Sequence, residues 1–386
     1  MLDAVVVGAG PAGLSCALLL AEEGFDVLVL EEHEQIGAPT HCTGVVSDEV
    51  SELFKVAEAT VLARPSRCAV VGPSGREVLL SSNGEGISVI DRALFDQDVA
   101  AAARRAGAEV RVGVRVRGLA VDRRGVLVTG ADGHGVAARA CVLACGVSYG
   151  LGRQVGLGLP AVALHSAQLE VDAAGAGGGV ELHVGRATAP QGFAWVVPVS
   201  REGAPRLKVG LMARGDAGTR LQRFLDRPDI APRLAGAPAA PWRRLLPLGP
   251  VPRTYAARVL AVGDAAGLTK PTTGGGIFYG LLSGALAAET LAEALRRDRL
   301  SADALAAYER GWRARLGSHL ALSSYVRRLL VTLDDAGLEA LLEAVGSDDV
   351  QEVIRRTARF NWHGGLIRSV LAQRGIKRVL LRSLFR

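Results

Sequence analysis

The chain has 386 residues, enough for about two or three domains, and it is 49% hydrophobic and 22% charged, as is typical of a globular protein with a sizeable core. The longest uncharged stretch, 271–288, contains five glycines and opens with turn residues, so we expect a buried loop and helix there instead of a membrane span. The net charge of +6 is accompanied by no nucleic-acid-binding motif, so we expect no nucleic-acid partner.

The cysteines and the start of the chain predict a cytoplasmic protein without a metal centre. The five cysteines have no paired spacing, which favours free thiols in a reducing compartment. A predicted strand begins at Leu2, so we expect no secretory signal.

Residues near the start of the chain carry a dinucleotide-binding fingerprint. An apolar strand at 2–7 leads into GAGPAG at 8–13, which opens a helix, and a second strand at 27–30 leads to Glu31. Gly8 allows a tight turn, Gly10 lets the backbone approach a pyrophosphate, and Gly13 lets the helix pack close to the strand. The acid in this position would take a ribose hydroxyl and repel a 2′-phosphate, which favours FAD or NAD over NADP.

The next part of the chain predicts more of the same sheet. Residues 32–47 should form a long loop beside the pyrophosphate, with Cys42 as a candidate thiol near a redox centre. Asp91 is a good N-cap for a helix over 92–105, and a cation at Arg92 opposes the helix dipole, which indicates a phosphate or other ligand role. Strands are predicted at 68–71, 78–80, 109–116, 126–129 and 141–144.

The pattern changes after residue 150 and returns after residue 257. Short β-like runs at 180–184, 194–199 and 206–212 predict a second, sheet-rich domain.

The strand predicted at 258–262 leads to a second candidate ligand site. Asp264 would bind ribityl or pyrophosphate-linked hydroxyls, and Gly276 and Ile277 would offer N–H groups to a flavin ring or phosphates. NAD needs only the first site, whereas two sites fit the longer FAD.

These patterns predict an α/β fold in which a Rossmann-like FAD-binding domain, with a doubly wound parallel sheet, is joined by a sheet-rich substrate domain and a helical C-terminal region. The FAD-binding domain is predicted to be discontinuous, with segments 1–65, 88–150 and 255–300. The substrate domain is predicted at 66–87 and 151–254, and the helical region at 301–386.

The end of the chain is strongly basic. Residues 351–386 contain nine Lys or Arg and one acid, Glu352. Apolar residues recur there at helical spacing, at Ile376, Val379, Leu380 and Leu384. This pattern is typical both of an ordinary solvated helix and of a helix that lies on an anionic membrane surface, so peripheral membrane contact is one of two open interpretations.

Two of the motifs, GAGPAG with Glu31 and VGD at 262–264, resemble the FAD-binding fold shared by para-hydroxybenzoate hydroxylase, flavin halogenases and geranylgeranyl reductases. Three further stretches resemble the geranylgeranyl reductase family in particular: IGAPTHCTG at 36–44, PQGFAWVVP at 190–198 and KPTTGGGI at 270–277. The second has Phe and Val where the family motif P-x-x-Y-x-W-x-F-P has Tyr and Phe. The C-terminal region is similar only in its helical character.

The resemblance implies site residues as well as a cofactor. FAD contacts are implied at Ala12, Glu31, Cys42, Thr43, Arg92, Val116, Asp264, Gly276 and Ile277. Phe193 and Trp195 would line a substrate cavity near the flavin, with Cys42 and Trp195 as the catalytic candidates. The alternative for the two aromatic residues is an alternating strand with its side chains in the core.

The implied reaction is the reduction of carbon–carbon double bonds in a geranylgeranyl-type prenyl chain of a diphosphate, an ether lipid or a quinone. Reduced flavin would deliver hydride from N5, and a proton would reach the other carbon. Trp195 could stabilise partial cationic character on the substrate, and Cys42 could shuttle the proton or gate the cavity.

The electron donor and the function class each leave alternatives. Relatives that bind NADPH carry Asp-Gly where this chain has Cys145-Gly146, so the donor is either a ferredoxin-like protein or NAD(P)H. The alternatives to a reductase are a flavin-dependent monooxygenase or halogenase, and an electron-transfer flavoprotein that passes electrons to quinone. A halogenase needs a catalytic lysine near its substrate, and the lysines of this chain are Lys55, Lys208, Lys270 and Lys377.

Overall fold

A mostly parallel sheet forms the centre of the Rossmann-like unit. The computed structural model describes residues 1–80, 84–175, 178–236 and 239–384, with side chains up to residue 380. The parallel strands lie in the order β19 (Val259–Ala261), β11 (Gly135–Leu143), β1 (Leu2–Val7), β2 (Val27–Leu30) and β8 (Glu109–Arg111). Because β1 lies in the middle and the chain continues to both sides of it, the sheet is doubly wound, as predicted.

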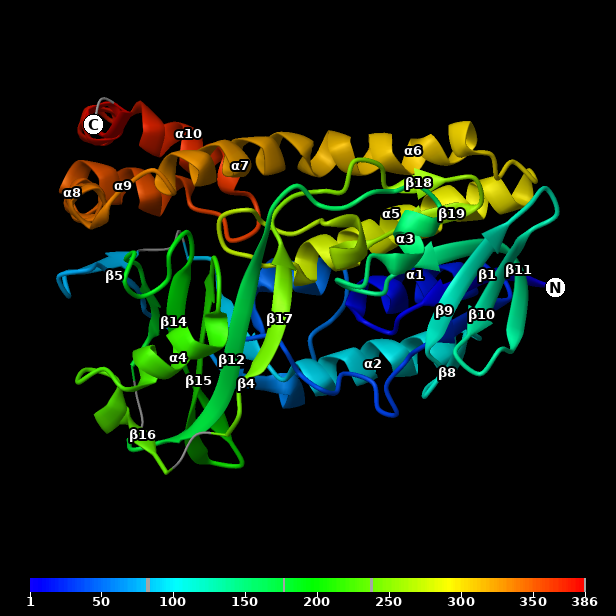
Figure 1. Ribbon diagram of the computed structural model, residues 1–386, viewed down its shortest axis with the longest axis horizontal. Helices are drawn as coiled ribbons and strands as arrows, with labels where there is room; N and C mark the ends of the chain where they lie inside the picture. The colour runs from blue at the N-terminus through cyan, green and yellow to red at the C-terminus, as the bar shows by residue number, and fades with distance from the viewer. Residues whose placement is uncertain (81–83, 176–177, 237–238, 385–386) are drawn as a thin grey trace.

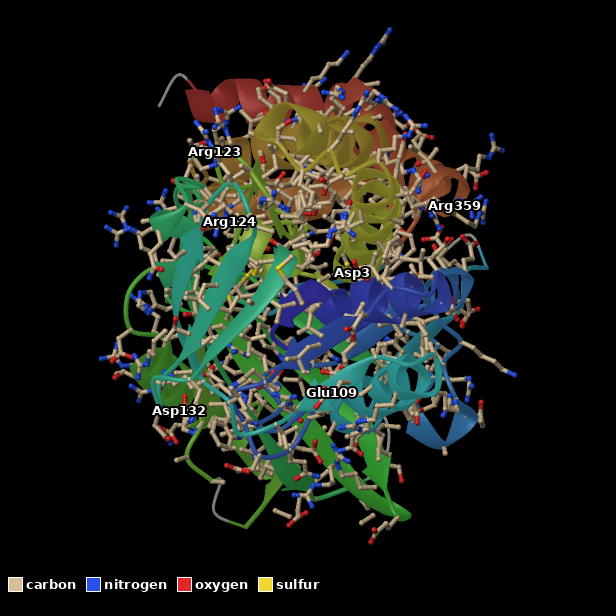
Figure 2. The ribbon with its side chains drawn as sticks, turned by 90° about the vertical axis from the view of Figure 1, so that its right-hand side faces the viewer. Asp3, Glu109, Arg123, Arg124, Asp132 and Arg359 are labelled. Carbon is tan, nitrogen blue, oxygen red and sulfur yellow. The ribbon has the colours of Figure 1, made fainter. Side chains whose placement is uncertain are left out.

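Antiparallel strands extend this sheet at its borders. β18 (Tyr255–Ala256) pairs with β19, and a ribbon of β9 (Val116–Val121) and β10 (Val126–Gly130) continues from β11. The turn of the ribbon carries Arg123 and Arg124, which Figure 2 labels. The carbonyl oxygen of Arg123 accepts a hydrogen bond from Arg258 at 2.7 Å, which ties the turn to the segment before β19.

The close crossing of two helices brings the two predicted ligand motifs together. Helix α1 (Pro11–Glu22) packs against α5 (Ile277–Arg296) and against α2 (Arg92–Arg105). A Cβ atom at Gly284 would lie 2.3 Å from the carbonyl oxygen of Ala12, so only glycine permits this contact. The crossing therefore places the first turns of α1 and α5 side by side, although they lie far apart in sequence.

A second sheet stands beside the first along the long axis of the molecule (Figure 1). Its order is β16-β12-β15-β14-β13-β5-β6, and β17 also pairs with β12. The strands are β5 (Cys68–Val71), β6 (Glu77–Leu80), β12 (Ala163–Ala173), β13 (Val180–His183), β14 (Phe193–Arg201), β15 (Ala204–Ala213), β16 (Leu234–Ala235) and β17 (Trp242–Pro247). Helix α4 (Ala217–Leu225) packs against β12 and β15.

Short elements connect the two sheets. β3 (Val45–Ser47), β7 (Ile87–Ile90) and β4 (Val61–Ala63) form a small third sheet that the sequence patterns did not predict. The remaining short helices are η1 (Asp48–Glu52), η2 (Glu58–Thr60), α3 (Gly150–Gln154), η3 (Ala231–Arg233) and η4 (Gly263–Ala266).

The C-terminal region is helical, as predicted, and α5, α6 and α7 run across the top of both sheets in Figure 1. Its elements are α6 (Ala302–Trp312), the π-helical turn η5 (Arg313–Gly317), α7 (Ser318–Leu330), α8 (Asp335–Val345), α9 (Asp348–Thr357), α10 (His363–Ala372) and α11 (Arg374–Leu384). Ile376 is 1% exposed, and Leu380 packs on the same small core, so this part of the apolar stripe of α11 faces inward. The side chain of Leu384 lies outside the described residues.

One predicted strand is wrong. Residues 109–116 do not form one strand, because Gly113 has a φ of +71° and turns the chain between β8 and β9. The strand predicted at 141–144 begins earlier, at Gly135, since its first half pairs with β10 in the antiparallel ribbon.

Candidate functional site

A cavity of about 1100 Å³ lies between the carboxyl ends of the first sheet and the inner face of the second. Its wall includes the predicted contact residues Gly8, Gly10, Ala12, Glu31, Cys42, Thr43, Arg92, Val116, Phe193, Trp195, Asp264, Gly276 and Ile277. Gly13 lies behind the wall, where a Cβ atom would come within 2.2 Å of the carbonyl oxygen of Gly8. The fold thus gathers one site from segments separated by more than 200 residues of sequence.

The glycines of the fingerprint differ in what surrounds them. Gly8 has a φ of +109°, and a Cβ atom there would lie 2.4 Å from the carbonyl oxygen of Ala144. Gly10 has no neighbour within 4 Å of such an atom and opens on the cavity. Helix α1 has no side-chain N-cap, so its first N–H groups are available to an anion. This open backbone is what a pyrophosphate requires.

Glu31 directly follows β2 and lines the same cavity. Its Oε2 atom accepts a hydrogen bond from the Ala9 amide at 2.7 Å, and its Oε1 atom lies 2.5 Å from Nδ1 of His33. The carboxylate is therefore fixed against the turn of the fingerprint.

The second ligand motif lies at the start of α5. Burial raises the pKa of Asp264, while the positive charges of Arg244 and Arg92 oppose that shift. Gly276 precedes α5 without a side-chain cap, and so leaves N–H groups for a ligand. Anion-binding backbone therefore meets the cavity from two helices, which fits the length and the charge of FAD.

Two cationic side chains, Lys208 and Arg92, lie against the Cys42 loop. Lys208 is 2% exposed and donates from Nζ to the carbonyl oxygen of Thr43 at 2.9 Å. Burial lowers the pKa of Lys208. Arg92 lies beside Cys42 but is also paired with Asp96 one turn along α2, at 2.9 Å. This ion pair compensates the unfavourable position of Arg92 at the helix start, so a bound phosphate is not needed to explain it.

Gln168 joins the Cys42 loop to the second sheet, and no sequence motif pointed to this residue. Its Oε1 atom accepts a hydrogen bond from Thr43 Oγ1 at 2.6 Å and another from Trp195 Nε1 at 3.3 Å. Phe193 meets the indole ring edge-on, at a centroid distance of 5.9 Å. Trp195 is 9% exposed and also belongs to a core cluster, so it both packs in the sheet and lines the cavity.

His41 precedes Cys42 in the same loop and also lines the cavity. Burial, with the positive charge of Arg244, lowers the pKa of His41 to about 4. Its ring meets Trp242 edge-on at 5.4 Å, and its Nδ1 atom has no hydrogen-bond partner among the described residues. His41 is therefore neutral at physiological pH, and it lines the cavity while its Nδ1 atom is buried.

The C-terminal region completes the cavity wall with Phe360, Asn361 and His363. These residues surround Lys270, whose Nζ atom donates to the carbonyl oxygen of Phe360 at 2.8 Å and to Asn361 Oδ1 at 3.1 Å. The motif around Lys270 was visible in the sequence. Its partners were not, since they come from a segment about 90 residues later that carries no motif.

Membrane-spanning helices and metal-binding clusters are both absent from the described residues. Among the described residues, no helix has the length and apolar character needed to cross a bilayer. In the same part of the chain, no group of three or more His, Cys, Asp or Glu is arranged to hold a metal ion.

Comparisons with known proteins agree with this geometry. Residues 6–55 match a family model described as an NAD(P)-binding Rossmann-like domain, and residues 243–351 match one described as lycopene cyclase protein. A digeranylgeranylglycerophospholipid reductase of Methanopyrus kandleri is 33% identical, with 92% of each chain covered. A second protein of that name, from Methanothrix thermoacetophila, is 30% identical, with 91% of this chain and 93% of the relative covered.

Solved structures share the fold at lower identity. A geranylgeranyl bacteriochlorophyll reductase-like protein of Thermoplasma acidophilum superposes with a TM-score of 0.86 at 23% identity, with 98% of each chain covered. The halogenase PltM, solved with phloroglucinol and FAD, gives 0.69 at 15% identity, with 99% of this chain and 90% of that one covered. FAD is the cofactor of the present chain, which belongs to the geranylgeranyl reductase family of FAD-dependent oxidoreductases.

Proposed function

We propose that this enzyme reduces the carbon–carbon double bonds of the prenyl chains of an ether-linked glycerophospholipid. The observation that carries the proposal is the two-part cavity, which has anion-binding backbone at one end and apolar side chains at the other. The relatives named digeranylgeranylglycerophospholipid reductases support this substrate over a free diphosphate or a quinone.

The apolar part of the cavity suits a hydrocarbon chain. Side chains of the second and third sheets line it, among them Val46, Cys68, Leu79, Ile87, Val180, Leu182, Val197 and Leu246. Each methylene moved from water into such a wall contributes about 0.8 kcal/mol, so a prenyl chain binds by burial alone. Phe193 and Trp195 belong to the same wall.

The side chains of the protein orient the prenyl substrate and exclude water. Bound FAD, once reduced, supplies the hydride. Trp195 offers a ring face to partial positive charge on the alkene and closes the cavity against water. Cys42 narrows the approach of the prenyl chain from a fixed position, because its loop is anchored at Thr43 by Lys208 and by Gln168.

The rival functions have less support. Lys270 lines the cavity, as a halogenase would require, so its position does not separate a halogenase from a reductase. The likeness to halogenases is a likeness of fold at 15% identity. The electron donor, either ferredoxin-like or NAD(P)H, and contact of the basic C-terminus with a membrane remain predictions.

Turnover of the lipid tests the proposal. The FAD-loaded enzyme, reduced anaerobically with dithionite, is mixed with digeranylgeranylglycerophospholipid, and the products are counted by mass. We expect stepwise addition of hydrogen pairs. An unchanged lipid beside a fully reduced flavin would refute the proposal.

Two substitutions in the wall sharpen this test. Cys42→Ala should keep FAD and accept electrons, yet stop at fewer saturated bonds. Trp195→Ala should admit water and speed reoxidation by oxygen without product. Cys16→Ala removes a thiol buried in α1, away from the cavity, and should leave the product distribution unchanged. A wild-type product pattern from Cys42→Ala would reduce Cys42 to an ordinary loop residue.

A further inference from the structure

Lys270 is a buried ammonium group in the wall of the cavity. It is 4% exposed and belongs to the loop that leads into α5. A Cβ atom built on Gly275 would lie 3.4 Å from its Nζ atom, so the ammonium sits against the glycine-rich backbone at the flavin end. The proposed function assigns it no task.

The C-terminal region supplies the acceptors that hold this ammonium. Arg359 lies exposed at the outer edge of the molecule (Figure 2), whereas the next two residues turn inward to Lys270. Nζ donates to the carbonyl oxygen of Phe360 and to Asn361 Oδ1, and lies 4.1 Å from the centroid of the Phe360 ring. An ammonium carries three N–H bonds. The third has no acceptor among the described residues, in a side chain that lines the cavity.

We propose that Lys270 is the proton donor of alkene reduction, an inference that rests on the proposed function. In this step the π electrons of the alkene form a new C–H bond with a proton of Nζ, and the N–H electron pair stays on nitrogen. The other alkene carbon takes the hydride that the bound cofactor supplies, so the alkene gains two hydrogens. Lys270 becomes a neutral amine and regains its proton from water between turnovers.

The surroundings of Lys270 suit an acid at neutral pH. Burial lowers its pKa to about 7, and the negative charges of Glu85 and Glu49 keep it from falling further. The other titratable groups of this pocket are Tyr279, which donates to the carbonyl oxygen of Asn361, and His363. A donor whose pKa lies near the working pH transfers a proton more readily than an ordinary lysine does.

The neighbouring histidine is a poorer candidate. Burial, with the charge of Lys270, lowers the pKa of His363 to about 4, so the ring is neutral. Its Nε2 atom lies 2.9 Å from the carbonyl oxygen of Phe360 and its Nδ1 atom 3.2 Å from Thr272 Oγ1. Both nitrogens are thus engaged within the protein.

Substitution of Lys270 in the FAD-loaded enzyme tests the proposal. Lys270→Gln keeps an N–H donor for Phe360 and Asn361 but has no proton to transfer, and Lys270→Arg keeps the charge but holds its proton. With the flavin reduced by dithionite, both should transfer hydride to the lipid at least about 100-fold more slowly. Added methylammonium should partly rescue Lys270→Gln, and Lys55→Gln, which changes an exposed lysine, should behave as wild type.

A measurement without turnover supplements the kinetics. In the oxidised holoenzyme labelled with ¹⁵N-lysine, one Nζ signal should titrate near pH 7 and vanish in Lys270→Arg. The role of Lys270 as proton donor would be overturned by wild-type rates in either variant that retains FAD. It would also be overturned by an Nζ signal of Lys270 that titrates near pH 10. Neither result would affect the proposed function. A wild-type enzyme that leaves the lipid unreduced would overturn the proposed function together with the role of Lys270.

Discussion

Gly10 and Gly13 belong to one motif but serve different purposes. Gly13 sits where α1 crosses β1, and a Cβ atom there would come within 2.2 Å of the backbone oxygen of Gly8. Gly10 faces open space in the cavity. One glycine is therefore required by the packing of the protein itself, and the other by the approach of a ligand.

This difference predicts opposite effects of two alanine substitutions. Gly13→Ala should destabilise the apoprotein by about 1–3 kcal/mol, because the helix must move away from the strand. Gly10→Ala should change the melting temperature little, yet raise the FAD dissociation constant at least about tenfold, or 1.4 kcal/mol. Thermal melts of the apoproteins and FAD titrations check both. Equal losses of stability in the two variants would contradict the distinction.

At the scale of elements, β13 is tied to η3 by a cluster of charges. Glu181 of β13 accepts two hydrogen bonds from Arg233, at 2.8 and 2.9 Å, and lies 3.1 Å from Nε2 of His183. Burial raises the pKa of Glu181, but the hydrogen bonds from His183 and Arg233 outweigh it and lower the pKa to about 2. The cluster fixes the strand that lies between β14 and β5 in the second sheet.

The lowered pKa predicts a contribution to stability that depends on pH. Because the folded pKa lies below the unfolded value of 4.5, the contribution is present above pH 4.5 and is lost as the pH falls towards 2. It should amount to about 1–3 kcal/mol. In Glu181→Gln, the free energy of unfolding measured with urea should fall less steeply between pH 4.5 and 2 than in wild type. Glu58→Gln, in an exposed ion pair, should leave that fall as in wild type.

At the scale of the molecule, all three regions meet at the cavity. The first sheet contributes strand ends, the second contributes Gln168 and Trp195, and the helical region contributes Phe360 and Asn361. The C-terminal helices therefore do more than cover the sheets, since one of their loops holds Lys270 in place.

The same site predicts slow reduction by NADPH. Cys145 and Gly146 line the cavity at the position where the family resemblance implies Asp-Gly for NADPH binding. Burial raises the pKa of Cys145 to about 11, so no thiolate takes the place of that carboxylate. In anaerobic stopped flow, dithionite should bleach the flavin quickly and NADPH slowly. Cys145→Asp should speed the reaction with NADPH. Rapid bleaching of the wild-type flavin by NADPH would contradict the prediction.

Local sequence patterns were enough to predict several elements of this protein. β1, β2 and α2 have the predicted bounds, because an apolar run, a glycine turn and the Asp91 N-cap act within a few residues. The same local chemistry marked Glu31 and Asp264, and the family resemblance marked Trp195; all three line the cavity.

The contacts between distant groups follow from the packing of the folded chain. Gln168 between Thr43 and Trp195, Lys208 under the Cys42 loop, and Asn361 beside Lys270 are contacts between segments about 30 to 170 residues apart. No local pattern encodes such pairs, because they arise from the order of β12, β15 and β14 in the second sheet, from the packing of the Cys42 loop against that sheet and from the docking of the helical region. Because a buried polar group without a hydrogen bond costs free energy, these groups pair with whichever donors and acceptors the packed chain brings next to them.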